Sequence, residues 1–120
     1  MNKIEHLLLC VAEEGGEITQ AAGKAGRFGL SDSPPNGGLP NNEYLVREVN
    51  DLLGVLELLQ EHGVPLPGIG DREMIEAKKA KVTHFMTYAT QRGTLMDQQS
   101  QCPAVCKEYC ASERGKLCGK

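Results

Sequence analysis

The stretch Tyr44–Leu59, YLVREVNDLLGVLELL, decides the fold class of this chain. Its apolar residues recur three and four positions apart, which is the spacing of one face of an α-helix. Asn41 and Asn42 precede it as candidate caps, and Gly63 follows it as a helix stop. We therefore expect a helix that ends at His62.

A second helical pattern lies upstream, where Asn2 and Glu5 have the spacing of a capping box. Apolar residues then recur at helical spacing, and we expect a helix over residues 3–24. Gly15 and Gly16 weaken this helix, and an internal Gly pair often lets another group approach the backbone closely.

The rest of the chain divides into a loop, a third helix and a tail. Residues 26–42 are rich in Gly, Pro, Ser and Asn and predict a long loop. Asp71 is suited to cap a third helix over residues 72–92. We expect an all-α domain over residues 1–95, an antiparallel bundle of three main helices per chain that oligomerisation completes, followed by a Cys-rich tail over 96–120.

The composition supports this fold class. The chain has 120 residues, fourteen Leu against seven Val and four Ile, and only 4% aromatic residues. This balance favours helices and fits poorly with a β-sandwich or a Rossmann domain. The net charge of −3 gives no overall attraction to nucleic acid. No apolar run approaches the ~20 residues of a membrane span and no signal-peptide pattern is present, so we expect a soluble cytoplasmic protein.

Acidic residues occupy positions where apolar residues are expected. Glu48 falls on the apolar face of its helix, and Asp51 lies at the edge of that face. On the first helix Glu14 lies at the margin of the apolar stripe and Glu17 one step beyond it. Antiparallel packing of the two helices would bring these four carboxylates together, where they would repel strongly without a cation. Oxygen ligands alone select Mg²⁺, with Mn²⁺ as a substitute.

Two alternative interpretations of the acidic residues are a solvent-exposed acidic surface and a di-iron site. They are ordinary solvent-facing groups if the helix registers differ slightly, which is the simpler interpretation for Glu13. A di-iron carboxylate site fits less well, because such sites use Glu-x-x-His pairs and neither acidic motif has His at the third position.

The two acidic motifs resemble the signature of a known family. Glu13-Glu14-Gly15-Gly16-Glu17 and Glu48-Val49-Asn50-Asp51 are similar to the EExxE and ExxD motifs of the MazG-like all-α nucleoside triphosphate pyrophosphohydrolases. The resemblance covers about residues 1–93. It implies Mg²⁺-dependent hydrolysis of nucleoside or deoxynucleoside triphosphates to the monophosphate and pyrophosphate. Because three helices with so few aromatic residues are small for a complete nucleotide pocket, we expect a homodimer or homotetramer.

The resemblance also implies roles for particular residues. The metal ligands would be Glu14, Glu17, Glu48 and Asp51, and the catalytic carboxylates Glu13, Glu17 and Glu48, with Glu13 orienting water. Cations should bind the phosphates of the substrate, and the candidates are Lys24, Arg27, Lys78 and Lys81. Tyr44 and Phe28 could border a base pocket, although core packing suits either residue.

Other functions stay open at this point. The same fold could act on a modified nucleotide, a dinucleotide polyphosphate or a phosphoribosyl-linked compound. The alternative from another class is a non-catalytic helical adaptor or regulator whose tail binds metal or a partner. That tail holds four cysteines, whose spacing is not a close match to a zinc site and whose cytosolic setting disfavours disulfides: Cys102, Cys106, Cys110 and Cys118.

Overall fold

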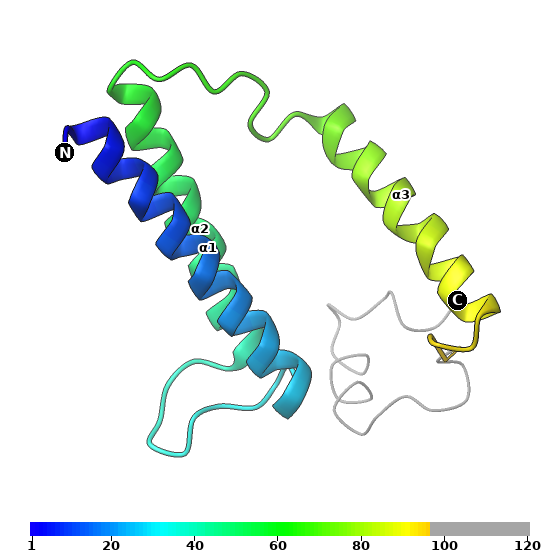
Figure 1. Cartoon of the computed structure of the whole chain (residues 1–120). Helices are drawn as coiled ribbons and strands as arrows, with labels where there is room; N and C mark the ends of the chain where they lie inside the picture. The colour runs from blue at the N-terminus through cyan, green and yellow to red at the C-terminus, as the bar shows by residue number, and fades with distance from the viewer. Residues whose placement is uncertain (97–120) are drawn as a thin grey trace. The chain divides into compact units, whose positions relative to one another are not determined.

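The computed structural model describes residues 1–96, and over this range the chain is helical, with no β-strand. Its helices are α1 (Lys3–Phe28), α2 (Asn41–Glu61) and α3 (Arg72–Gln91) (Figure 1). The all-α fold class predicted from the sequence is therefore confirmed. The expected role of the cysteines in the tail falls outside the described residues.

The chain divides between Leu66 and Pro67 into two compact units, and each is described by itself. The first unit is a hairpin of α1 and α2, and the second contains α3. None of the helices described over residues 1–96 combines the length and the apolar character that crossing a membrane requires.

Helix α1 begins with the predicted capping box. The Asn2 side chain accepts a hydrogen bond from the backbone N–H of Glu5 at 2.9 Å, and the Glu5 carboxylate accepts one from the backbone N–H of Asn2 at 2.9 Å. The prediction that this helix ends at Lys24 is wrong by about one turn. An internal Gly26 costs only about 1 kcal/mol, and α1 continues until Gly29 adopts a φ of 98°, which other residues rarely adopt.

The two glycines in the middle of α1 do not mark a close contact within the described part of the chain. A Cβ atom built at Gly15 or Gly16 would meet nothing within 4 Å. The close approach expected at this pair is therefore not made by residues 1–96.

Helices α1 and α2 lie side by side and run antiparallel (Figure 1). The beginning of α1 and the end of α2 meet, since Asn2, His6 and His62 line one shallow pocket. The contact between the helices buries Leu7 and Ala21 on α1 and Leu59 on α2, which is only 1% exposed. These side chains form a thin aliphatic seam.

The connection between the two helices is anchored by Asn41. Its side-chain amide donates a hydrogen bond to the Gly29 carbonyl at 2.8 Å, and its backbone N–H donates one to the Asp32 carbonyl at 2.9 Å. The prediction that Asn41 or Asn42 caps α2 is wrong, because the N-cap is Pro40 and has no side-chain cap. The Asn41 side chain is 7% exposed and instead satisfies a carbonyl at the end of α1.

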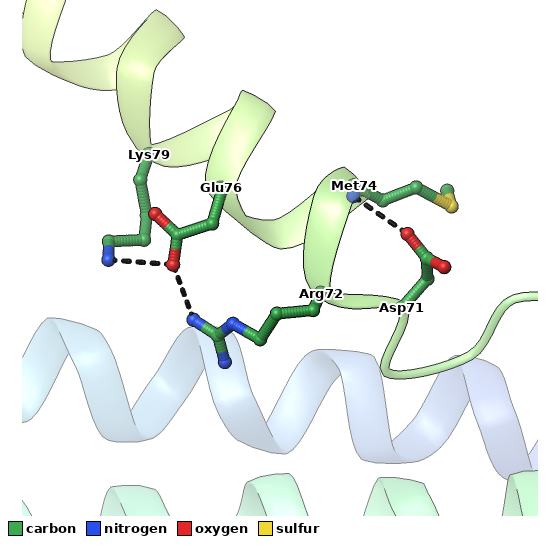
Figure 2. Close-up of polar contacts among 5 residues, drawn as sticks. All are labelled: Asp71, Arg72, Met74, Glu76 and Lys79. Atoms are coloured by element: carbon green, nitrogen blue, oxygen red, sulfur yellow. Dashed lines mark hydrogen bonds and ion pairs between the residues drawn. The ribbon is translucent and has the colours of Figure 1, made fainter.

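Helix α3 is supported by contacts within its own sequence (Figure 2). The predicted cap is confirmed, since the Asp71 carboxylate accepts a hydrogen bond from the backbone N–H of Met74 at 2.9 Å. One oxygen of Glu76 pairs with Arg72 at 2.6 Å and with Lys79 at 3.1 Å. No residue of α3 is buried in the structure.

A candidate carboxylate metal centre

Three carboxylates from the two helices of the hairpin meet in one place. Glu14 and Glu17 come from consecutive turns of α1, and Glu48 comes from the middle of α2. Each offers one oxygen atom, and these three oxygens lie within 4.8 Å of one another. Helical periodicity places Glu14 and Glu17 on one face of α1, and antiparallel packing places Glu48 opposite them.

Glu48 is the member of this cluster that is hardest to explain as a surface group. The residue is only 6% exposed, and its Oε2 atom has no hydrogen-bond partner. The Oε2 atom of the partly buried Glu14 also lacks a partner. Buried carboxylate oxygens are expensive to leave unpaired, so the hairpin keeps two oxygens that would be stabilised by a bound cation.

The electrostatics of the cluster also favour a bound cation. A hydrogen bond with Glu17, followed by burial and by the neighbouring carboxylates, raises the pKa of Glu48 above its ordinary value. Burial, followed by the negative charges of Glu17 and Asp51, raises the pKa of Glu14. Both shifts mean that the ionised cluster is unfavourable without a positive charge among its oxygens.

The donor set suits a hard divalent cation. Glu14, Glu17 and Glu48 supply only carboxylate oxygens, and no His or Cys of residues 1–96 joins them. Mg²⁺ and Mn²⁺ accept such ligands, whereas Zn²⁺ and Cu²⁺ are usually bound through His or Cys. The residues present therefore fit the Mg²⁺ site expected from the sequence.

Asp51 and Glu13 lie near the cluster without belonging to its closest group. Asp51 is exposed on α2, yet its negative charge contributes to the raised pKa of both Glu14 and Glu48. Glu13 is exposed on α1 and has the smallest influence on the pKa of Glu14. Their predicted roles, metal binding for Asp51 and water orientation for Glu13, stay predictions.

A small pocket of about 140 Å³ adjoins the cluster on the same hairpin. Glu17 and Glu48 form part of its lining, and the remaining lining residues are Gln20, Ala21, Lys24 and Tyr44. The Lys24 ammonium lies 6.0 Å from the centre of the Tyr44 ring. Of the basic residues predicted to bind phosphate, Lys24 is therefore placed beside the carboxylates.

Gln20 is a lining residue that the sequence analysis did not name, whereas Tyr44 was named there as one of two residues that could border a base pocket. Gln20 is three positions after Glu17, and Tyr44 is four positions before Glu48, so helical spacing puts each beside a carboxylate. That spacing was the available signal. Core packing was the role favoured for Tyr44, but the side chain is 37% exposed and lines the pocket.

The other predicted phosphate-binding residues are described on their own helices. The Arg27 guanidinium stacks over the neighbouring Phe28 ring at 4.7 Å, and both residues are exposed at the end of α1. Lys78 and Lys81 are exposed on α3, in the second unit. Their roles in substrate binding stay predictions.

Comparison with known proteins adds no relative. No family model, no curated protein and no solved structure matches the chain.

Proposed function

We propose that this protein is a Mg²⁺-dependent nucleotide pyrophosphohydrolase, which hydrolyses nucleoside or deoxynucleoside triphosphates to the monophosphate and pyrophosphate. The observation that carries the proposal is the convergence of Glu14, Glu17 and Glu48, with a buried and unpartnered oxygen on Glu48. A helical adaptor would have no use for a buried acidic cluster, which lowers the stability of its own hairpin. The resemblance of the two acidic motifs to the MazG-like enzymes supplies the reaction.

Different residues of the hairpin would have different roles in this reaction. Glu14, Glu17 and Glu48 would hold the cation, joined by Asp51 from the next turn of α2. When bound, Mg²⁺ neutralises phosphate charge and polarises the phosphorus for attack. The attacking water would give its proton to one of the three predicted catalytic carboxylates, Glu13, Glu17 or Glu48.

Oligomerisation is part of the same proposal. Large apolar side chains stay exposed along α3, among them Val82 (45%), Phe85 (54%) and Met86 (51%). Exposed apolar faces of this kind are covered in stable helical assemblies. We therefore propose a homodimer or homotetramer in which helices of different copies complete a bundle.

The test is a product assay on the purified full-length chain. The protein is incubated with a panel of nucleoside and deoxynucleoside triphosphates and Mg²⁺, and the products are identified by chromatography. Monophosphate together with pyrophosphate is the expected pair. Diphosphate with orthophosphate, or no turnover of any substrate by a folded, Mn²⁺-binding sample, would overturn the proposal.

A matched pair of variants links this activity to the cluster. Glu48→Gln should lower turnover by at least about a hundredfold, since it removes a carboxylate that binds the cation. Glu57→Gln, which changes an exposed acid on the same helix, should retain turnover. Equal activity in the two variants would place the reaction elsewhere.

A further inference from the structure

The open end of the hairpin, where α1 begins and α2 ends, brings two histidines together. His6 lies near the start of α1, and His62 is the C-cap of α2. Both line one pocket of about 280 Å³, and the buried Leu7 forms part of the same lining. Both histidines are exposed to solvent. Each helix therefore presents one imidazole at a site that an ion can enter.

The register of the two helices places these imidazoles on the same side of the hairpin. Lys24 and Tyr44 mark this side, since the Lys24 ammonium lies 6.0 Å from the centre of the Tyr44 ring. His6 precedes Lys24 by eighteen positions, and His62 follows Tyr44 by eighteen positions. Eighteen residues complete about five turns of an α-helix. His6 and His62 therefore face each other across the hairpin in the way that Lys24 and Tyr44 do.

The described part of the chain leaves both imidazoles without a polar partner. The side-chain hydrogen bonds and ion pairs of residues 1–96 involve no ring nitrogen of His6 or His62. A neutral imidazole has one nitrogen that can accept, and this nitrogen is the commonest protein ligand of metal ions. Paired imidazole nitrogens suit Zn²⁺, Ni²⁺ or Cu²⁺, whereas Mg²⁺ prefers oxygen.

The charges around the pocket permit a bound cation. The carbonyl end of a helix favours positive charge, and the last turn of α2 has no basic residue that supplies it. The positive end of α1 is balanced by Glu5, whose carboxylate closes the capping box. Lys3 also lines the pocket, but it is exposed, so its flexible side chain can hold the ammonium group in water away from an ion.

The histidine pair is separate from the carboxylate cluster in position and in chemistry. Glu14 is the member of the cluster that lies nearest to His6 in the sequence, eight positions further along α1. This separation corresponds to about 12 Å along the helix axis. The hairpin thus holds oxygen donors in its middle and nitrogen donors at its open end, and an ion at one place leaves the other free.

We propose that His6 and His62 form a second metal site, which binds a divalent transition-metal ion of the Zn²⁺ class through one imidazole nitrogen from each helix, with water completing the coordination. The bound ion links the start of α1 to the end of α2. Two protein ligands make an exchangeable site, since closed structural zinc sites use four. The site goes beyond the proposed reaction and does not depend on it.

NMR of the imidazole rings in the full-length chain tests the site. Long-range proton–nitrogen spectra follow the ring nitrogens of His6, His62 and His84 while Zn²⁺ is added in the presence of excess Mg²⁺. The resonances of His6 and His62 should shift together with one dissociation constant, because both rings bind the same ion. His84, which is exposed on α3, should not respond at these concentrations. Each ring is observed separately, so Zn²⁺ that binds to cysteine is not counted.

Matched variants distinguish one shared ion from two independent surface histidines. His6→Gln should weaken Zn²⁺ binding at His62 by about tenfold or more, and His62→Gln should do the same at His6, because a single ligand loses the gain in effective concentration. His84→Gln should leave the affinity unchanged. Saturating Zn²⁺ should raise the melting temperature of the unsubstituted chain more than that of either hairpin variant, since the ion binds the folded hairpin.

Separate dissociation constants for His6 and His62, or an unchanged affinity at the remaining histidine of either hairpin variant, would overturn the inference. The absence of any ring shift at millimolar Zn²⁺, or an equal response from His84, would also overturn it. Nucleotide turnover is not measured in this experiment, so its failure would leave the proposed reaction standing.

Discussion

The hairpin of α1 and α2 and the helix α3 have similar apolar spacing in the sequence, but they differ in what they bury. The hairpin buries Leu7, Ala21 and Leu59 together with one carboxylate, Glu48. In α3 no residue is buried, and its cap and ion pairs link residues three or four apart. A helix can therefore be specified by local contacts alone, whereas a site requires a second helix.

The two regions also differ in charge. Residues 1–66 carry ten acidic and four basic side chains, whereas residues 67–96 carry three acidic and five basic ones. The excess of acids in the hairpin includes the cluster around Glu48, where ionisation is unfavourable without a cation. The hairpin therefore has lower stability because of the acidic cluster that forms its candidate metal site.

The largest expected effect is a difference in the free energy of unfolding between a substitution in the buried seam and one on the exposed face of α3. Leu59→Ala should lower the free energy of unfolding by about 3 kcal/mol, because it removes a fully buried side chain. Phe85→Ala should cost less than about 0.5 kcal/mol in dilute protein. Urea denaturation measures both.

The dependence of stability on protein concentration gives a second test with the same two variants. If copies associate through α3, the cost of Phe85→Ala should grow as the protein concentration rises, while the cost of Leu59→Ala stays constant. A cost for Phe85→Ala that does not change with concentration would contradict the proposed assembly.

The second effect concerns pH and metal removal. The raised pKa values of Glu14 and Glu48 mean that, without metal, the folded hairpin takes up protons more readily than the unfolded chain. Its stability should be fully present below the ordinary glutamate pKa of 4.5 and should fall as the pH rises through the raised values. Thermal melts in EDTA, followed by circular dichroism, measure this fall.

Thermal melts of two variants, and of the unsubstituted chain with Mg²⁺, test whether the cluster causes this pH dependence. Glu48→Gln should raise the melting temperature in EDTA near neutral pH and reduce the fall, since it removes a buried charge, whereas Glu57→Gln should leave the fall unchanged. Mg²⁺ should stabilise the unsubstituted chain near neutral pH much more than Glu48→Gln. A melting temperature in EDTA that rises toward neutrality would contradict the raised pKa values.

The smallest effect belongs to the local contacts of α3. Asp71→Ala should destabilise the start of this helix by about 1 kcal/mol, because the backbone N–H of Met74 loses its acceptor. Hydrogen exchange of the first-turn amides should accelerate in this variant, whereas Asp71→Ser, which keeps an acceptor, should restore protection. Faster exchange throughout the hairpin would show that the two units are coupled.

Much of the fold was predictable because helix formation depends on nearby residues. The capping box at Asn2, the cap at Asp71 and the ends of α2 and α3 within about one residue all follow from short-range patterns. The end of α1 was predicted one turn early, since the cost of an internal glycine does not by itself end a helix. Asn41 was misassigned as a cap, because its true partner, the Gly29 carbonyl, lies twelve positions away.

The candidate site, like the fold, was predictable in part. Glu48 stood out because an acid occupied an apolar position, and Glu14 and Glu17 followed from the margin of the stripe on α1. Gln20 did not stand out, since this residue type is common on a helix surface, and Tyr44 was named without any indication that it lies beside the carboxylates. Only the alignment of α1 against α2 puts them on the walls of one pocket.

From the sequence alone it follows that the described chain is helical, where α1 and α3 begin, and which acids share a face of each helix. The reason is that helical periodicity and capping act over three or four residues. The packing of α1 against α2 is what brings Glu48 to Glu14 and Glu17, and Lys24 to Tyr44. Those contacts depend on the relative register of the two packed helices. The connection anchored by Asn41 and the buried seam around Leu59 together set this register.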